Sequence, residues 1–326
     1  MKSSPVFWAG ILAGMNNLFV SVIVPVYNDS ARLVKCLEAL RSQTYPQDAY
    51  EVIVVDNASE QDIRGAVSLF QSIVYTYESH PGPAAARNKG IGMAKGTVIA
   101  FTDSDGRPNP NWIEKGVERL LADPGASLAG GEIEVFFQNQ NHPTLVELFH
   151  KNYFKQRELV EKRNFSAAAN LFVRREVFER AGLFDDTFDL AACEDREWGE
   201  RVHAMGFRIV FAEKAVVMHP SRRTLSQLAS RNAEFSIGNY RYEVVRYRSG
   251  HGDRPSSLGK ELLALFKPPF RSATRYFKPV EGVWPKAKMY GVVLFDHYTR
   301  VWANIRVRIG WHPGRILFRK KWSSHE

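Results

Sequence analysis

The stretch Thr97-Val98-Ile99-Ala100-Phe101-Thr102-Asp103-Ser104-Asp105 decides how the rest of the chain is interpreted. Its first six residues are mostly apolar or β-branched, as in a strand buried within a parallel sheet. Asp103 and Asp105 follow where that strand should end, and open α/β sheets bind ligands at the carboxyl ends of their strands. Two carboxylates one residue apart can face one divalent cation such as Mg²⁺ or Mn²⁺. A solvated turn with the same composition is the alternative.

The length of 326 residues allows one α/β domain of about 220 residues and an appendage. A hydrophobic content of 44% and a charged content of 24% are ordinary for a folded protein. For the two cysteines, Cys36 and Cys193, we expect reduced thiols rather than a disulfide framework. No stretch of the sequence approaches the roughly 20 apolar residues that span a bilayer.

Charge is unevenly distributed along the chain. Residues 221–326 contain 21 Lys and Arg against 7 Asp and Glu, a net charge of +14, which leaves −5 for residues 1–220. A basic, aromatic-rich region of this kind indicates an anionic partner, either a membrane surface or a nucleic acid. We therefore expect three parts: an N-terminal extension (1–17), an α/β domain (18–220) and a mainly helical C-terminal region (221–326).

Strands and helices alternate in the first part of that domain. The predicted strands are 18–25, 51–55, 73–75 and 97–102, and helices are predicted between them and over 111–121. This alternation predicts a mostly parallel central sheet with helices on both faces. Neither G-x-G-x-x-G after the first strand nor G-x-x-x-x-G-K-[ST] occurs, so dinucleotide and P-loop sites are weak interpretations.

The second part of the chain is less regular. Its patterns predict strands over 126–137, 167–173 and 207–218 and helices over 144–162, 174–181 and 194–205. Beyond Pro220 we expect helices over 222–248, 258–277 and 283–309, with an exposed loop at 249–257.

Several short motifs occur in order between residues 18 and 220. They are Val22-Ile23-Val24-Pro25-Val26-Tyr27-Asn28, Val54-Val55-Asp56-Asn57-Ala58-Ser59, Gly82-Pro83-Ala84-Ala85-Ala86-Arg87-Asn88-Lys89-Gly90, Asp103-Ser104-Asp105, Asn170, Gly182-Leu183-Phe184-Asp185 and Glu194-Asp195-Arg196-Glu197-Trp198. Each motif is weak alone, but the ordered set resembles the family 2 inverting glycosyltransferases of the GT-A fold. The resemblance implies transfer of a sugar from a nucleotide diphosphate donor to an acceptor hydroxyl.

The same resemblance implies a donor site. Pro25 and Tyr27 would edge the nucleotide, and Asp56 would accept a hydrogen bond from the imide N–H of uracil or thymine. Arg87 would lie near the donor phosphates, where its planar donors suit anionic oxygens. The complete set of expected nucleotide-sugar-binding residues is Pro25, Tyr27, Asn28, Asp56, Arg87, Asp103, Ser104 and Asn170. For Asn170 a capping or turn role is the alternative.

A cation site is implied as well. Asp105 would bind Mn²⁺ or Mg²⁺, and Asp103 would hold the ribose, the cation or its water. The cation would bridge the diphosphate oxygens and stabilise the charge that grows on the leaving group. His219 matches a position where some relatives place a further metal ligand, although a His before Pro is often structural.

The resemblance also implies that the catalytic residues lie at the start of the helix predicted over 194–205. Asp195 matches the position of the base that takes the acceptor proton, with Glu194 beside it as a supporting group. Alternatively, both carboxylates only satisfy the first-turn amides of their helix. Trp198 would offer an apolar wall for the acceptor sugar, or would simply belong to the core.

Processive synthases of this family carry a Q-x-x-R-W motif. Here Gln227 and Arg231 are one residue too far apart and Asn232 follows, so we expect single additions to a glycan or lipid-linked acceptor. The basic tail suits the anionic cytoplasmic face of a membrane, so we expect a cytoplasmic enzyme that can be peripheral at that face. The alternative is that the tail packs on its own domain or on a second subunit. A non-catalytic nucleotide-sugar-binding protein and a nucleic-acid-binding protein are the rival interpretations.

Overall fold

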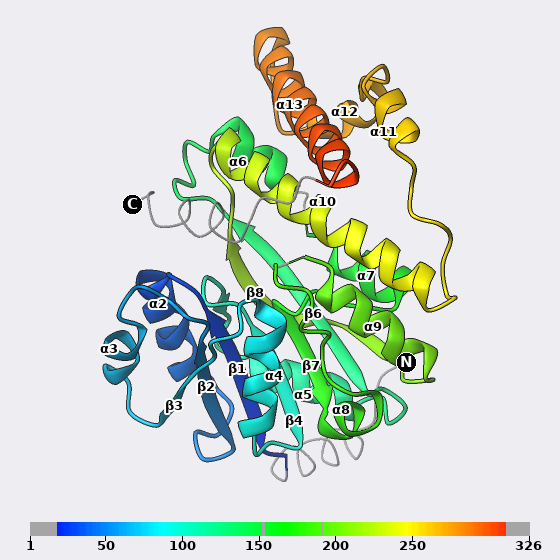
Figure 1. Cartoon of the computed structure of the whole chain (residues 1–326). Coiled ribbons are helices and arrows are strands. Elements are labelled where there is room, and N and C mark those ends of the chain that lie inside the picture. Colours follow the sequence, from blue (N-terminus) through cyan, green and yellow to red (C-terminus); the bar gives the residue numbers. More distant parts are fainter. Residues whose placement is uncertain (1–17, 152–153, 191, 311–326) are drawn as a thin grey trace. The chain divides into compact units, whose positions relative to one another are not determined.

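The computed structural model describes residues 18–151, 154–190 and 192–310 (Figure 1). The extension expected at residues 1–17 lies outside the described residues. The residues group into two compact units, each with most of its contacts inside the unit. The first unit comprises the chain up to Glu134, Phe154–Asp189 and Glu194–His219, and the second comprises Val135–Tyr153, Leu190–Cys193 and the chain from Pro220.

Four parallel strands form one half of the sheet in the first unit. They are β1 (Val20–Val26), β2 (Tyr50–Asp56), β3 (Ile73–Tyr77) and β4 (Val98–Thr102), in the order β3-β2-β1-β4. Val26 pairs with Asp56 at the carboxyl ends of β1 and β2. Because parallel strands end at the same edge of a sheet, the residues that follow β1, β2 and β4 gather there. All four strands predicted for this region are confirmed.

The other half of the sheet is antiparallel. Its strands are β7 (Asn170–Arg174), β6 (Leu128–Phe136), β8 (Ile209–Pro220) and β5 (Arg107–Pro108), in that order after β4. The β4–β7, β6–β7 and β5–β8 pairs are antiparallel, so the sheet is mixed and its parallel part is the N-terminal half. Met218 pairs with Arg107. The next residue of β8, His219, is therefore brought beside the turn that carries Asp105.

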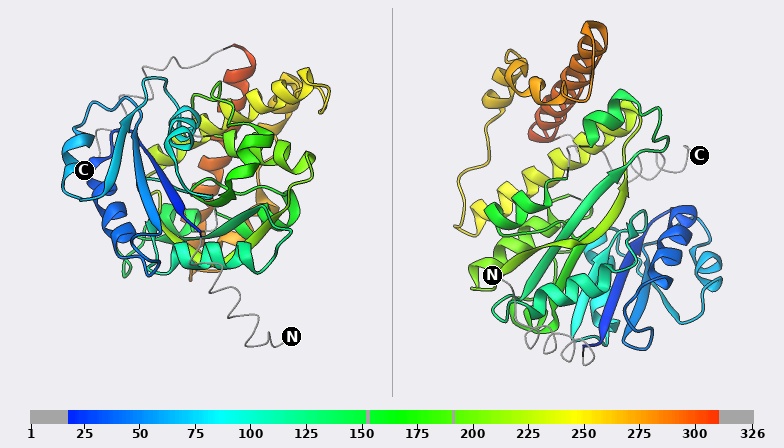
Figure 2. Two further views of the ribbon diagram at one scale, coloured as in Figure 1. Left: turned by 90° about the horizontal axis from the view of Figure 1, so that it is seen from below. Right: turned by 180° about the vertical axis from the view of Figure 1, so that it is seen from behind.

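Helices cover both faces of this sheet (Figures 1 and 2). Alternate side chains of β1 point to opposite faces, so Val22 and Val24 join one core and Ile23 joins the other. The helices of the first core are α2 (Ser30–Arg41), α3 (Ile63–Ser68) and α5 (Trp112–Leu121). Those of the second core are α4 (Pro83–Met93), α8 (Arg175–Ala181) and α9 (Glu194–Ala204).

The small residues of α4 let this helix lie close to the sheet. A Cβ at Gly90 would be only 2.5 Å from Cγ2 of Ile23. The helix begins after Gly82, whose φ of +119° is a conformation that glycine adopts without strain. The Gly82 N–H donates to Oδ1 of Asn57 over 2.7 Å, which ties the start of α4 to the loop after β2. These contacts fix the position of Arg87.

Two helices predicted from the sequence are interrupted. The predicted helix 144–162 consists of α6 (Leu145–His150), in the second unit, and α7 (Gln156–Arg163), in the first. Gln156 is buried and donates to the carbonyl of Gly131, so α7 begins where its first side chain is anchored to β6. The predicted helix 258–277 breaks at Pro268-Pro269, because proline disfavours helical backbone before it and removes an N–H. It forms α11 (Leu258–Ala264), α12 (Phe270–Ala273) and a 3₁₀ turn (Thr274–Tyr276).

Two long helices organise the second unit. α10 (Leu225–Arg248) and α13 (Val283–Arg308) pack together, with Leu228, Met289 and Val293 in their shared core. The side-chain amide of Asn232 on α10 donates to the carbonyl of Asp296 over 3.1 Å and to Oγ1 of Thr299 over 2.9 Å. Within the part of the chain that the structure describes, no helix combines the length and apolar character needed to cross a membrane.

Candidate active site

The residues Asp103, Ser104 and Asp105 form the turn that follows β4. The N–H of Gly106 donates to the carbonyl of Asp103 over 3.0 Å and closes the turn. A Cβ at Gly106 would be 2.9 Å from Oγ1 of Thr102, so a side chain at this position would crowd the turn. Ser104 is buried, whereas the side chains of Asp103 and Asp105 are 33% and 16% exposed. The turn therefore presents two carboxylates to a ligand.

His219 completes a cluster with these two acids. One ligand atom each from Asp103, Asp105 and His219 lies within 4.8 Å of the others. Nε2 of His219 is 3.3 Å from Oδ1 of Asp105, and the ring of Phe154 packs on the imidazole with centroids 4.9 Å apart. The structure thus brings together the three residues that the sequence predicted as metal ligands.

This donor set fits a hard divalent cation, because two carboxylate oxygens and one imidazole nitrogen leave positions for diphosphate oxygens and water. Arg32 on α2 lies beside it, with Nη1 3.5 Å from Oδ2 of Asp105 and Nε 2.8 Å from Oδ1 of Asp29. Sequence reasoning missed Arg32. The only signal for it is its spacing of three from Asp29, which places both side chains on one side of the start of α2.

Arg87 connects this turn to the start of α9. Its guanidinium is buried and donates from Nη1 to Oε1 of Glu194 over 2.8 Å and from Nη2 to Oδ1 of Asp103 over 3.2 Å. Burial lowers the pKa of Arg87, but Glu194 and Asp103 raise it by more, so the group stays charged. One N–H of each terminal nitrogen of Arg87 is therefore paired with an acid, and one of these acids, Asp103, belongs to the cluster. The expected position of Arg87 near the donor phosphates stays a prediction.

Glu194 is the buried member of the acid pair that begins α9. Burial raises its pKa to about 7, the neighbouring Asp195 adds to the rise, and Arg87 opposes it. Oε2 of Glu194 has no hydrogen-bond partner among the described residues, which agrees with a carboxyl that is protonated part of the time. Asp195 is half-buried, and its Oδ1 accepts from the N–H of Arg196 over 2.8 Å.

The variant Glu194→Gln is expected to change how stability depends on pH. Between the ordinary pKa of 4.5 and the raised value of about 7, the folded protein binds more protons than the unfolded chain. The wild type should therefore lose free energy of unfolding as the pH rises through this window, and Gln cannot titrate. We expect the melting temperature of the variant, relative to that of the wild type, to increase from pH 5 to pH 7.5. A difference in melting temperature that stays constant across this range would contradict a raised pKa of Glu194.

Asp56 is placed at the carboxyl end of β2, as predicted. Its carboxylate is buried and accepts from the N–H of Ser59 and from the hydroxyl of Tyr75, both over 3.0 Å. Burial and the bond to Asp56 both raise the pKa of Tyr75. A carboxylate has about four acceptor positions, so these bonds leave room for a further donor.

The loop after β1 carries the other residues expected at the nucleotide. Pro25 and Tyr27 are half-buried. Asn28 is buried with a φ of +49°, and its Oδ1 accepts from the N–H of Glu60 over 2.7 Å. Asn28 therefore joins the loop after β1 to the loop after β2. Its expected contact with the nucleotide sugar stays a prediction.

Asn170 and Trp198 lie in the interior instead. The amide of Asn170 accepts from Nε1 of Trp112 over 2.8 Å and donates to the carbonyls of Glu132 and Ala215. The Trp198 side chain is 1% exposed and stacks on Phe178 with ring centroids 4.9 Å apart. Both residues are buried, which favours the core alternative for Trp198. The bonds of Asn170 join β6, β8 and α5 rather than form a cap. The donor- or acceptor-orienting role expected of Asn170 and the acceptor wall expected of Trp198 stay predictions.

Comparison with known proteins identifies the family. Residues 21–182 match the profile described as Glycosyl transferase family 2. Glycosyltransferase AglE of Haloferax volcanii is 36% identical over 210 residues, which cover 63% of this chain and 67% of that protein. Two further curated relatives are longer, and this chain spans only 34% and 47% of their lengths.

Two solved structures share the fold. The mannosyltransferase PcManGT from Pyrobaculum calidifontis, in complex with GDP-Man and Mn²⁺, has a TM-score of 0.58 and 18% identity, with 93% of this chain and 96% of that chain covered. S. aureus TarS 1-349, in complex with UDP, has a TM-score of 0.50 and 15% identity, with coverage of 90% and 92%. At such identities the likeness shows only the fold, which is GT-A. Taken with the sequence relatives, it places the chain in glycosyl transferase family 2, as a glycosyltransferase.

Proposed function

We propose that the protein is an inverting enzyme that moves a sugar from a UDP- or dTDP-sugar to an acceptor hydroxyl, with Mn²⁺ or Mg²⁺ at Asp103, Asp105 and His219. One observation carries the proposal: Arg87 bonds both to Asp103 of this cluster and to Glu194, which precedes the predicted base. The cation site and the start of α9 therefore belong to one connected group of charges. A cation bound there would supply Lewis-acid stabilisation of the departing diphosphate.

The other roles in the proposed reaction belong to residues of this chain. Asp195, in the first turn of α9, takes the proton of the attacking hydroxyl on the face of the sugar opposite the nucleotide, which inverts the anomeric centre. Arg87 holds Glu194 and Asp103 in place beside the donor phosphates. Arg32 partly balances the charge of Asp105, which reduces the electrostatic repulsion between the carboxylates of the turn.

Asp56 supports the choice of nucleotide. Its buried carboxylate at the end of β2 suits an imide N–H, which uracil and thymine present, and Pro25 and Tyr27 lie on the adjacent strand end. The nucleotides bound in the two solved structures of the same fold differ, because one holds GDP-Man and the other UDP. The nucleotide therefore needs a direct test.

For the acceptor we propose a glycan or lipid-linked precursor, as in polysaccharide assembly, with one sugar added per encounter. The second unit would bring the enzyme to the anionic cytoplasmic face of a membrane. A non-catalytic sugar-nucleotide binder would show donor affinity without turnover. A nucleic-acid-binding protein would show affinity for DNA or RNA that falls steeply with salt.

A screen of UDP-, dTDP- and GDP-sugars with and without Mn²⁺ tests the proposal. We expect cation-dependent thermal stabilisation and slow donor hydrolysis with a uracil or thymine nucleotide. A response confined to GDP-sugars would contradict the role given to Asp56. A screen with neither stabilisation nor hydrolysis by any donor would contradict the enzyme proposed here.

A further inference from the structure

The short helix α11 in the second unit buries its glutamate and exposes two of its leucines. Glu261 is buried, at 9% exposure, whereas Leu262 and Leu263 are 43% and 62% exposed. A helix that packs on a protein core buries its apolar stripe and exposes its charges. The orientation of α11 is therefore the opposite of that in an ordinary core-facing helix.

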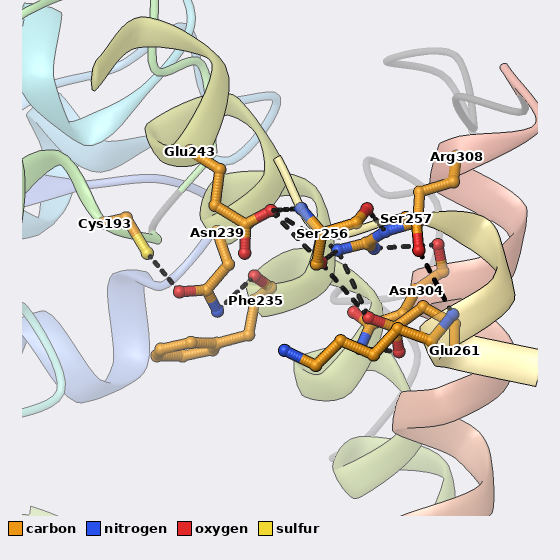
Figure 3. A network of polar contacts seen from close by, with 10 residues as sticks. Cys193, Phe235, Asn239, Glu243, Ser256, Ser257, Glu261, Asn304 and Arg308 are labelled. Carbon is orange, nitrogen blue, oxygen red and sulfur yellow. Dashed lines mark hydrogen bonds and ion pairs between the residues drawn. The ribbon is translucent and has the colours of Figure 1, made fainter. Parts of the chain in front are cut away.

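Polar contacts fix this orientation (Figure 3). Oε1 of Glu261 is 3.3 Å from Nη2 of Arg308, and the amide of Asn304 donates to Oε2 of Glu261 over 3.0 Å. Nε of Arg308 donates to the carbonyl of Ser256 over 2.9 Å, and the same guanidinium is 3.4 Å from Glu243 of α10. An Arg and an Asn of α13 therefore hold Glu261 from within, and Leu262 and Leu263 of the same helix are left exposed.

Further apolar side chains are exposed on the elements that follow. Phe266 is 82% exposed, and the ring of Phe270 stacks on Tyr290 of α13 but remains 63% exposed. At the start of α13, Trp284 is 79% exposed. We call the following set the outer apolar surface: Leu262, Leu263, Phe266, Phe270, Val283 and Trp284. Six large apolar side chains left exposed within residues 262–284 are more than scattered surface positions would give, and they favour an interaction surface.

Exposed basic side chains occur in the same stretch of the chain as this surface. Within residues 258–288 the described side chains include five exposed lysines, and the exposed acid among them is Glu281. The lysines are Lys260, Lys267, Lys278, Lys286 and Lys288. Apolar side chains among lysines match a bilayer interface, where the former enter the acyl boundary and the latter meet anionic headgroups. Two copies of the chain would instead bring like charges together at this surface.

We propose that the outer apolar surface docks on an anionic phospholipid bilayer. The proposal rests on the membrane partner proposed above and specifies the residues that make the contact. Leu262, Leu263 and Phe266 enter the interface from one side, with Trp284 from the start of α13. Lys260 and Lys267 bind the headgroups.

Co-sedimentation of the full chain with vesicles tests this surface. Wild-type protein is expected to bind phosphatidylcholine vesicles that contain 30% phosphatidylglycerol, and to bind much less to pure phosphatidylcholine or in 0.5 M salt. Absence of binding to the anionic vesicles at low salt would overturn the proposal. Donor hydrolysis is measured without vesicles, so a failure of the glycosyltransferase proposal would appear in that assay alone.

Two sets of variants separate the contributions. L262S/L263S/F266S is expected to weaken vesicle binding by about 30-fold or more, because three apolar side chains no longer enter the interface. K260E/K267E alters only exposed side chains and is expected to weaken binding about tenfold at low salt. Leu69→Ser, at a leucine that is 69% exposed after α3, is the matched control and should bind as wild type.

The controls also test whether the outer apolar surface binds a second copy of the chain instead of a bilayer. Far-UV circular dichroism shows whether each variant is folded. If L262S/L263S/F266S is not folded, vesicle binding by K260E/K267E tests the docking surface instead. Sedimentation velocity without lipid should give the same species for wild type and variants. Dissociation of a wild-type dimer by L262S/L263S/F266S would show that the surface binds another copy and would overturn the proposal, as would unchanged vesicle binding by K260E/K267E.

Discussion

Replacing Asp195 by Asn is expected to lower the rate of sugar transfer by about 10²–10⁴ while leaving donor affinity unchanged. The side-chain oxygen of Asn can still accept from the N–H of Arg196, as Oδ1 of Asp195 does, so the first turn of α9 should keep its geometry. An amide cannot take the proton of the acceptor hydroxyl at neutral pH. Steady-state rates with the accepted donor, and donor binding by calorimetry, provide the measurement.

Glu197→Gln is the matched control for this variant. Glu197 lies in the same helix, and its carboxylate pairs with Arg201 over 2.8 Å. It has no part in the proposed site, so turnover should stay near the wild-type value. Wild-type turnover in the Asp195 variant would remove Asp195 as the base, and equal losses in both variants would indicate damage to α9 instead.

Replacing Asp105 by Asn is expected to have an effect of similar size through the cation. The change removes one of the two carboxylates of the cluster, so transfer at low Mn²⁺ should fall by about 10²–10⁴. It also removes the negative charge that lies 3.5 Å from Arg32, so the net charge becomes more positive where a cation should bind. The loss should shrink at millimolar Mn²⁺, and rate measurements over a Mn²⁺ series would show this.

Asp123→Asn provides the comparison for the Asp105 variant. The carboxylate of Asp123 follows α5 and pairs with Arg208, outside the proposed site. Its substitution should leave both turnover and the Mn²⁺ dependence unchanged. A rate for the Asp105 variant that equals the wild-type rate at every Mn²⁺ concentration would contradict a role for this acid in binding the cation.

The sheet and the acid cluster could be predicted because their signals are local or follow from strand direction. The apolar runs of β1, β2 and β4 are buried on both faces, and such strands are nearly continuous in hydrophobicity. Asp56 and Asp105 then reach one edge because parallel strands end together. His219 was expected only from the resemblance. The structure explains its position through the pairing of Met218 with Arg107.

The roles of Arg87, Asn170 and Trp198 could not be obtained in the same way. Each stands within a motif, but motif membership does not reveal whether a side chain points into the core or toward a ligand. Arg87 is separated from Glu194 by 107 residues, and only the packing of α4 and α9 on one face of the sheet brings them into contact.

The orientation of α11 is a second example. Its sequence is amphipathic, which indicates two faces but not which of them packs on the protein. Glu261 turns inward because Asn304 and Arg308, more than 40 residues later, provide its partners. Pro268 and Pro269, in contrast, do indicate locally that the predicted helix 258–277 must break.

The central claim is that Asp103, Asp105 and His219 hold a divalent cation on which the donor diphosphate binds. Calorimetric titration of Mn²⁺ into the protein with UDP, repeated with the Asp105→Asn variant, tests it most directly. The account predicts one Mn²⁺ per chain in the wild type, strengthened by UDP, and an affinity at least about tenfold weaker in the variant. Equal Mn²⁺ affinity in the two proteins, or Mn²⁺ binding that UDP does not strengthen, would contradict it.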